Sequence, residues 1–252
     1  MAPFSYHSHG TTLHAVHGGA GDAVVFVHGG LADHRAALMA VGGLLPDHHL
    51  VLPDLRGAGR SVFSGPITWD LLGDDLAALL DHLGLEQATV GGTSAGSGAA
   101  LACALRHPSR VTRLVLAAPV FAGEASGLTA AQSQAMNAMD AMARRGVAEG
   151  VDAFLPIYDA LPAPIRARAH AMAREFDMPS VAATTALLAS GAQPFGSMDA
   201  LTAISCPVLV IPGTDPQHPA SVAHQIAEVL PSPTLTEPGA NPGDAIREWL
   251  GS

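Results

Sequence analysis

The residues best suited to do chemistry lie in the segment 90–96, which reads Val-Gly-Gly-Thr-Ser-Ala-Gly. This pattern predicts a buried strand that runs through a Gly-x-Ser-x-Gly turn into a helix. Glycine is expected at positions 92 and 96 because a side chain there would collide with the neighbouring strand and helix. The turn would expose the Ser94 hydroxyl above a helix N-terminus, whose free N–H groups favour developing negative charge. Ser94 is therefore the candidate nucleophile, and an ordinary glycine-rich turn is the alternative interpretation.

Three further motifs each follow an apolar run that is typical of a buried strand. They are His-Gly-Gly at 28–30, Asp-Leu-Arg-Gly-Ala-Gly-Arg-Ser at 54–61 and Gly-Thr-Asp at 213–215. In this order, and together with the serine turn, they resemble the motifs of the α/β-hydrolase superfamily over nearly the whole chain. The resemblance implies an α/β fold with a mostly parallel twisted sheet, flanked by helices and carrying a helical lid insertion.

The same resemblance implies roles for several residues of the site. The backbone N–H groups of Gly30 and Ala95 would form the oxyanion hole, and Asp215 would be the acid that orients a histidine. A turn residue that makes a local bond before a proline is the alternative for Asp215. The polar segment 33–35 (Asp-His-Arg) either contacts a polar group of the substrate or caps the first helix.

One part of the family pattern is missing from the expected place. The family carries its catalytic histidine on a loop after the last strand, but residues 238–244 read Pro-Gly-Ala-Asn-Pro-Gly-Asp. After Asp215 the chain has only His218 and His224, both close in sequence to that acid, and His218 is expected simply to begin the next helix. We therefore expect no imidazole to reach Ser94 from this side. His28 is the candidate substitute base, with a structural role in its loop as the alternative.

The chain alternates between strand-like and helix-like stretches, which predicts a parallel sheet covered on both faces. Between residues 122 and 204 this alternation stops, and helix starts are expected at the capping box 129–132, near Pro164 and at Ser180. We therefore divide the chain into an α/β-hydrolase core, 1–121 and 205–252, and a helical lid, 122–204. The expected elements are an edge hairpin at 4–17, strands near 23–28, 49–53, 87–92, 112–118, 206–212 and 233–237, and helices near 34–45, 70–83, 95–107, 217–230 and 245–250.

Composition excludes several classes of function. A charged fraction of 13% with 48% apolar residues is typical of a globular protein, and the net charge of −10 argues against a nucleic-acid partner. No apolar run is long enough for a membrane span, and no signal peptide is expected. The histidines at 7, 9, 14 and 17 do not have a recognised metal-ligand spacing. Two cysteines, expected as free thiols, suggest a cytoplasmic location.

These observations favour an enzyme that acts on a small, largely apolar carbonyl compound, most simply an ester or a lactone, without cofactor or metal. Met136, Met139 and Met142 of the expected lid would supply flexible apolar surface. Because the histidine is missing, turnover of simple esters is expected to be slow. A non-hydrolytic cyclase or lyase on the same scaffold, or a ligand-binding protein with a degenerate triad, are the alternatives. The substrate and the oligomeric state stay open.

Overall fold

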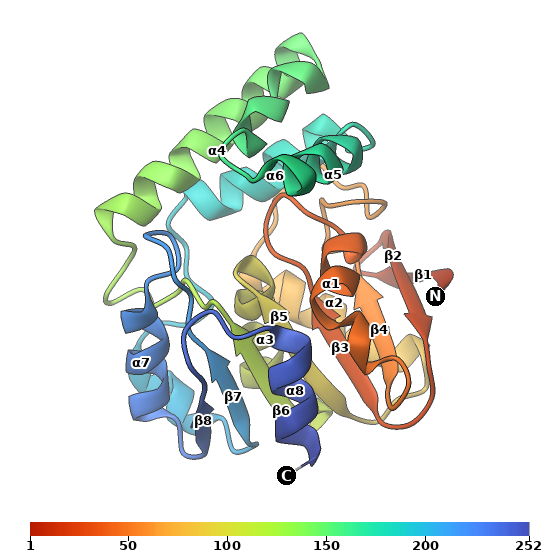
Figure 1. Ribbon diagram of the computed structural model, residues 1–252, viewed down its shortest axis with the longest axis vertical. Helices are drawn as coiled ribbons and strands as arrows, with labels where there is room; N and C mark the ends of the chain where they lie inside the picture. The colour runs from red at the N-terminus through yellow and green to blue at the C-terminus, as the bar shows by residue number, and fades with distance from the viewer. Residues whose placement is uncertain (252) are drawn as a thin grey trace.

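The computed structural model describes residues 1–251 and contains an eight-stranded sheet in the order β1-β2-β4-β3-β5-β6-β7-β8 (Figure 1). β1 and β2 form an antiparallel hairpin, β2 also pairs with β4 in the antiparallel sense, and all the other pairs are parallel. The mostly parallel sheet predicted from the sequence is confirmed. The strands are β1 (Ala2–Ser8), β2 (Thr11–Gly18), β3 (Ala23–Val27), β4 (His49–Pro53), β5 (Ala88–Thr93), β6 (Val111–Ala117), β7 (Val208–Ile211) and β8 (Pro233–Leu235).

Helices cover both faces of this sheet, which explains why its strands are almost continuously apolar. In β3, Val25 and Val27 belong to the core that includes α2 (Trp69–His82), α3 (Ala95–Arg106) and α7 (Ala220–Val229). Val24 and Phe26 point to the opposite face and belong to the core with α1 (His34–Val41) and α8 (Pro242–Gly251). Consecutive side chains of a strand alternate between faces, so β2, β3, β4, β6 and β7 each contribute to both cores.

Residues 122–204 form a helical insertion, and none of its described residues belongs to a strand of the sheet. Figure 1 shows α4, α5 and α6 grouped together at one end of the molecule, and they enclose an apolar cluster of their own. The division into a core and a lid remains a prediction about domain boundaries. The helices are α4 (Ala130–Glu149), α5 (Ala163–Ala173) and α6 (Met178–Ala189), with short 3-10 turns at Val151–Ala153, Leu155–Tyr158 and Met198–Ala203.

Local sequence signals place most of the helix starts, with two exceptions. Thr129 and Gln132 form the expected reciprocal capping box at the start of α4. Ser180, expected as the cap of α6, is instead its third residue, and Asp177 is the cap that accepts the Ser180 N–H. The helix expected from residue 217 begins only at Ala220, because the preceding residues form a tight turn. No described helix is both long and apolar enough to cross a membrane.

Candidate active site

Ser94 lies at the sharp turn between β5 and α3, in a left-handed conformation with φ 56° and ψ −116°. Such a backbone costs a non-glycine residue roughly 1–3 kcal/mol and is held in place only by tightly fitting surroundings. A Cβ added to Gly92 would lie 2.4 Å from the carbonyl carbon of Gly96, and one added to Gly96 would lie 2.5 Å from the backbone oxygen of His28. The predicted need for both glycines is confirmed.

His218 is the imidazole that reaches Ser94, and this corrects the sequence-based expectation that none would. Its Nε2 lies 2.9 Å from the Ser94 Oγ, and its Nδ1 lies 2.9 Å from Oδ2 and 3.0 Å from Oδ1 of Asp215. A serine hydroxyl, an imidazole and a carboxylate are thus connected in the order that triad chemistry requires. The triad is not degenerate in its geometry; its histidine lies on the acid loop rather than after the last strand.

A tight turn after β7 explains how two residues so close in sequence can face each other. The N–H of His218 donates to the backbone oxygen of Asp215 over 3.0 Å, and Pro216 supplies the fixed φ that suits such a turn. A Cβ on Gly213 would lie 2.4 Å from the Cβ of His218, so only glycine allows the loop to fold back this closely. The combination of Gly213, Pro216 and His218 is therefore the signal in the sequence for this turn.

The Asp215 carboxylate is kept in its charged form, which suits an orienting acid. Burial alone would raise its pKa, but hydrogen bonds from the His218 ring and from the N–H groups of Gln217 and His218 outweigh burial and lower the pKa. The Asp215 side chain is 53% exposed and that of His218 is 22% exposed. Solvent therefore screens this pair more than it would a buried pair.

His28, the expected substitute base, forms hydrogen bonds to backbone groups other than Ser94 through both of its ring nitrogens. It is 2% exposed, its Nδ1 donates to the backbone oxygen of Gly29 over 2.7 Å, and its Nε2 accepts the N–H of Leu55 over 3.0 Å. Desolvation by burial lowers its pKa. Neither ring nitrogen is free to serve Ser94, so this histidine fixes the turn after β3, which was the structural alternative.

The expected oxyanion donors lie beside the serine. Gly30 and Ala95 line the same cavity as Ser94, and within the described chain neither of their N–H groups donates to a protein acceptor. A Cβ on Gly29 would lie 3.5 Å from the Ser94 Cβ, which shows how closely the turn after β3 approaches the nucleophile. Their function as an oxyanion hole remains a prediction that this arrangement favours.

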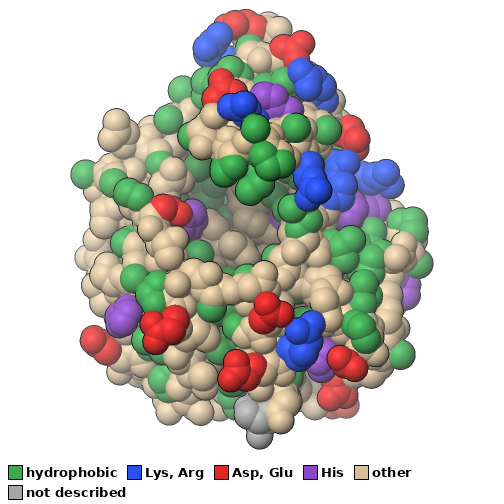
Figure 2. All heavy atoms as spheres, in the orientation of Figure 1, with side chains coloured by type: hydrophobic (Ala, Val, Ile, Leu, Met, Phe, Trp, Pro, Cys, Tyr) green, Lys and Arg blue, Asp and Glu red, His purple; other side chains and the backbone are tan. Residues whose placement is uncertain are grey.

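A cavity of about 360 Å³ opens above Ser94 and beneath the helical insertion. Figure 2 shows a hollow on this face with hydrophobic side chains along the rim beside the insertion. Among the described residues that line it there is no lysine or arginine, and Asp215 is the one carboxylate. Its apolar walls come from Ala118, Val120, Phe121, Ala135, Met136, Met139 and Leu188.

The methionines of α4 divide between two environments. Met136 and Met139 line the cavity, as expected for lid residues above the nucleophile. Met142 instead packs against the apolar cluster inside the insertion, together with Phe154 and Tyr158. The Tyr158 hydroxyl donates to the backbone oxygen of Leu31 over 2.8 Å, which links the insertion to the segment that follows the oxyanion turn.

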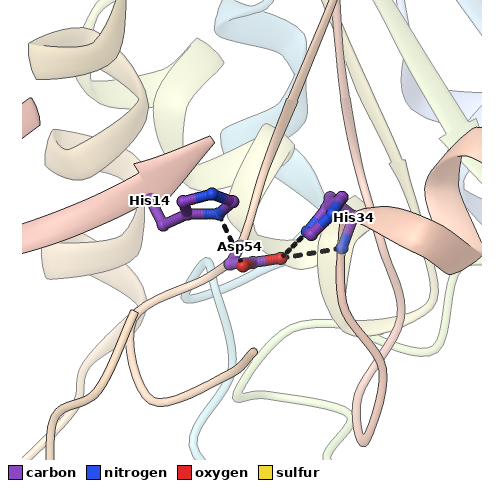
Figure 3. Close-up of side chains that lie close together, drawn as sticks. All are labelled: His14, His34 and Asp54. Atoms are coloured by element: carbon purple, nitrogen blue, oxygen red, sulfur yellow. Dashed lines mark hydrogen bonds and ion pairs between the residues drawn. The ribbon is translucent and has the colours of Figure 1, made fainter. Parts of the chain in front are cut away.

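Figure 3 shows a second cluster, made of two histidines and a carboxylate. Asp54 is fully buried between His14 and His34, with Nδ1 to carboxylate distances of 2.9 Å and 2.8 Å. The N–H groups of His34 and Arg60 also donate to this carboxylate, so each of its oxygens already accepts two hydrogen bonds. Asp33 caps α1 by accepting the Arg35 N–H, which supports the capping interpretation of residues 33–35.

The two histidines and Asp54 are also close enough together to be considered as metal ligands. For the three side chains to hold a metal ion, both imidazole Nδ1 atoms would have to give up their hydrogen bonds to the Asp54 carboxylate, whose two oxygens also accept the N–H groups of His34 and Arg60. Burial would raise the pKa of Asp54, but hydrogen bonds from His14 and His34 outweigh burial and hold the pKa well below its ordinary value. The arrangement therefore fits a hydrogen-bonded network better than a metal centre.

Comparison with known proteins agrees with the fold and the motif order. The model of the alpha/beta hydrolase fold family matches residues 17–214. This chain belongs to the alpha/beta hydrolase family.

Individual relatives are more distant. An esterase structure from Thermogutta terrifontis, with malate bound, is 25% identical and superimposes with a TM-score of 0.80 over 100% of this chain and 98% of its own. A Caulobacter sp. (strain K31) protein named for carbamate hydrolysis, RutD, is 40% identical over 36% of this chain and 40% of its own. Lipase LipV of Mycobacterium tuberculosis is 36% identical over 44% of this chain and 42% of its own. The match thus spans about two-fifths of the length of each of these two curated relatives, and together these similarities support a hydrolase.

Proposed function

We propose that this member of the alpha/beta hydrolase family is a serine hydrolase that cleaves small, uncharged esters or lactones through an acyl-serine intermediate. The observation that carries the proposal is the continuous contact from Ser94 Oγ to His218 Nε2 and from His218 Nδ1 to Asp215. The esterase from Thermogutta terrifontis, which aligns over the whole chain, supports ester cleavage. The carbamate-hydrolase relative supports it less, because that match covers a smaller part of both chains.

The geometry supports a two-step reaction. His218 Nε2 takes the hydroxyl proton as Ser94 Oγ attacks the substrate carbonyl carbon, and the N–H groups of Gly30 and Ala95 stabilise the tetrahedral oxyanion. The imidazolium, oriented by Asp215, then gives its proton to the departing alkoxide. A water molecule repeats the sequence on the acyl-serine, releasing the carboxylic acid and restoring the hydroxyl.

The cavity supports a small and neutral substrate. A volume of about 360 Å³ lies at the lower end of the range for small-molecule sites. Its apolar walls favour an alkyl or aryl acyl group. An acyl group with its own carboxylate would meet Asp215 and no lysine or arginine among the described lining residues. Because burying an uncompensated anion is costly, such substrates should be disfavoured.

The alternatives from the sequence, a cyclase or lyase and a binding protein, depended on the missing histidine. Since His218 contacts Ser94, that reason no longer applies. The expectation of slow turnover loses its basis in the same way.

A direct test combines a fluorophosphonate probe with two chromogenic esters. The probe should label Ser94 and leave Ser94→Ala unlabelled. p-Nitrophenyl acetate should be hydrolysed with a kcat/KM at least about tenfold above that for p-nitrophenyl hemisuccinate, which carries a carboxylate. His28→Gln is the matched control, because His28 is the other candidate base. The folded variant should keep the wild-type dependence of kcat/KM on pH. Absence of labelling at Ser94 would reject the proposed chemistry, and equal use of both esters would reject the proposed selectivity.

A further inference from the structure

We propose that Gln132, at the start of α4, is a positioning residue that holds the His218 turn in its working place. The inference deepens the proposed function and rests on His218 being the base. Gln132 is 2% exposed and lines the same cavity as Ser94 and His218. It lies outside all the motifs by which the family resemblance was recognised.

The Gln132 side chain joins the start of α4 to the segment after β6 and to the His218 turn, which lies 85 positions away in the sequence. Its Oε1 accepts the N–H of Thr129 over 2.9 Å, which completes the capping box of α4. Its Nε2 donates to the backbone oxygen of Val120, after β6, over 3.0 Å. The same Nε2 donates to the backbone oxygen of Gln217, the residue before His218, over 3.2 Å.

The contact with Gln217 is the feature that matters for the base. The remaining hydrogen bonds of residues 215–218 are local to the turn, apart from the one between His218 and Ser94. In the described chain, Gln132 therefore provides the one other hydrogen bond that ties this turn to a different element. A loop that carries a catalytic base needs such support, since a displacement of about 1 Å can cost 10²-fold in rate.

The amide is required here for a reason that the capping box does not explain. Glutamate serves equally well in a capping box, because that position needs only an acceptor for the cap N–H. Glutamate cannot donate to the carbonyls of Val120 and Gln217, however, and would place negative charge against both of them. The choice of Gln132 is therefore explained by its two donated hydrogen bonds, one of which reaches the His218 turn.

The test compares Gln132→Glu with Thr129→Ala. The first variant keeps the capping interaction and removes both donated bonds, whereas the second removes the Thr129 hydroxyl that accepts the Gln132 N–H over 3.2 Å. We expect Gln132→Glu to lower kcat for p-nitrophenyl acetate roughly 10- to 100-fold with KM within about twofold, and to shift the acid limb of the kcat/KM profile. Thr129→Ala should lower the melting temperature and keep the wild-type kcat and pH profile.

A measurement without turnover separates this inference from the proposed function. The amide exchange rate of His218 and the titration of its ring protons, followed by NMR, should change in Gln132→Glu and stay unchanged in Thr129→Ala. If Gln132→Glu fails to fold, Gln132→Met, which is uncharged and lacks the donor, should show the same changes. Wild-type kcat and NMR behaviour in the folded Gln132 variants would overturn the inference. An inert wild-type enzyme whose His218 signals still respond to Gln132→Glu would overturn the proposed function and leave the positioning role supported.

Discussion

Two of the clusters in which histidine and aspartate are in direct contact have different properties, because their surroundings differ. Asp215 orients His218, whose second ring nitrogen meets a serine hydroxyl in an open cavity. Asp54 is buried between His14 and His34 and receives four hydrogen bonds (Figure 3). The comparison shows that closeness of imidazole and carboxylate does not identify a catalytic site.

What separates the two clusters is whether the second ring nitrogen of the imidazole faces a reactive group in the cavity. Asp215 fixes one nitrogen of His218 and leaves the other directed at Ser94, where a proton can be exchanged with a substrate. The Nε2 of His14 is buried with no hydrogen-bond partner, and Nδ1 of His34 is hydrogen-bonded to Asp54. The first cluster therefore suits proton transfer, and the second suits holding β2, the end of β4 and the start of α1 together.

The largest effect should come from breaking the reactive cluster at its centre. Ser94→Ala and His218→Ala should each lower kcat for p-nitrophenyl acetate by about 10⁴- to 10⁶-fold, because nucleophile and base act as one unit. The double variant should be no worse than either single variant. A His218→Ala enzyme that keeps more than about a tenth of wild-type kcat would show that another group is the base.

In the buried cluster the expected effect is on folding rather than on chemistry. Asp54→Ala removes a fully buried carboxylate that accepts four hydrogen bonds and should lower the free energy of unfolding by about 3–5 kcal/mol, measured by urea denaturation. Asp152→Asn is the control, since its side chain is 82% exposed and pairs only with Arg174 at the surface. Its effect should stay within about 0.5 kcal/mol. Equal stability of the Asp54 variant and the control would refute the structural role.

Asp215→Asn should lower the reaction rate with little loss of stability, which is the reverse of the effect expected for Asp54→Ala. A buried triad carboxylate is worth about 10⁴-fold in kcat. Because the Asp215 side chain is 53% exposed, we expect a smaller loss of about 10²-fold, with an unfolding free energy within about 1 kcal/mol of wild type. A loss as large as that of Ser94→Ala would mean that solvent screens this carboxylate far less than its exposure indicates.

The smallest effect should be a dependence of stability on pH that comes from His34. The hydrogen bond to Asp54 raises the pKa of His34, so its protonated form is favoured in the folded state. The resulting stabilisation is fully present below the unfolded pKa of about 6.5 and is lost as the pH rises through the folded pKa. We expect a decline of about 0.5 kcal/mol in the unfolding free energy across this window, absent in His34→Gln. Identical pH profiles for the two proteins would contradict this assignment.

The sequence by itself determined the features that depend on a few neighbouring residues. Gly92 and Gly96 fixed the serine turn, Thr129 and Gln132 fixed the start of α4, and the apolar strand runs fixed the parallel sheet. Each leaves a characteristic pattern of residue types in a short stretch of the chain, and for that reason the fold and the position of Ser94 were predictable.

Only the tertiary structure decided which histidine serves Ser94. His218 lies three residues after Asp215, which looked too close, and it meets a serine 124 positions earlier in the chain. That meeting depends on β5 and β7 ending at the same edge of the sheet, each paired with β6, and on a turn that folds tightly over Gly213. Contacts between distant side chains depend on how whole elements pack, and no local spacing in the sequence expresses that packing.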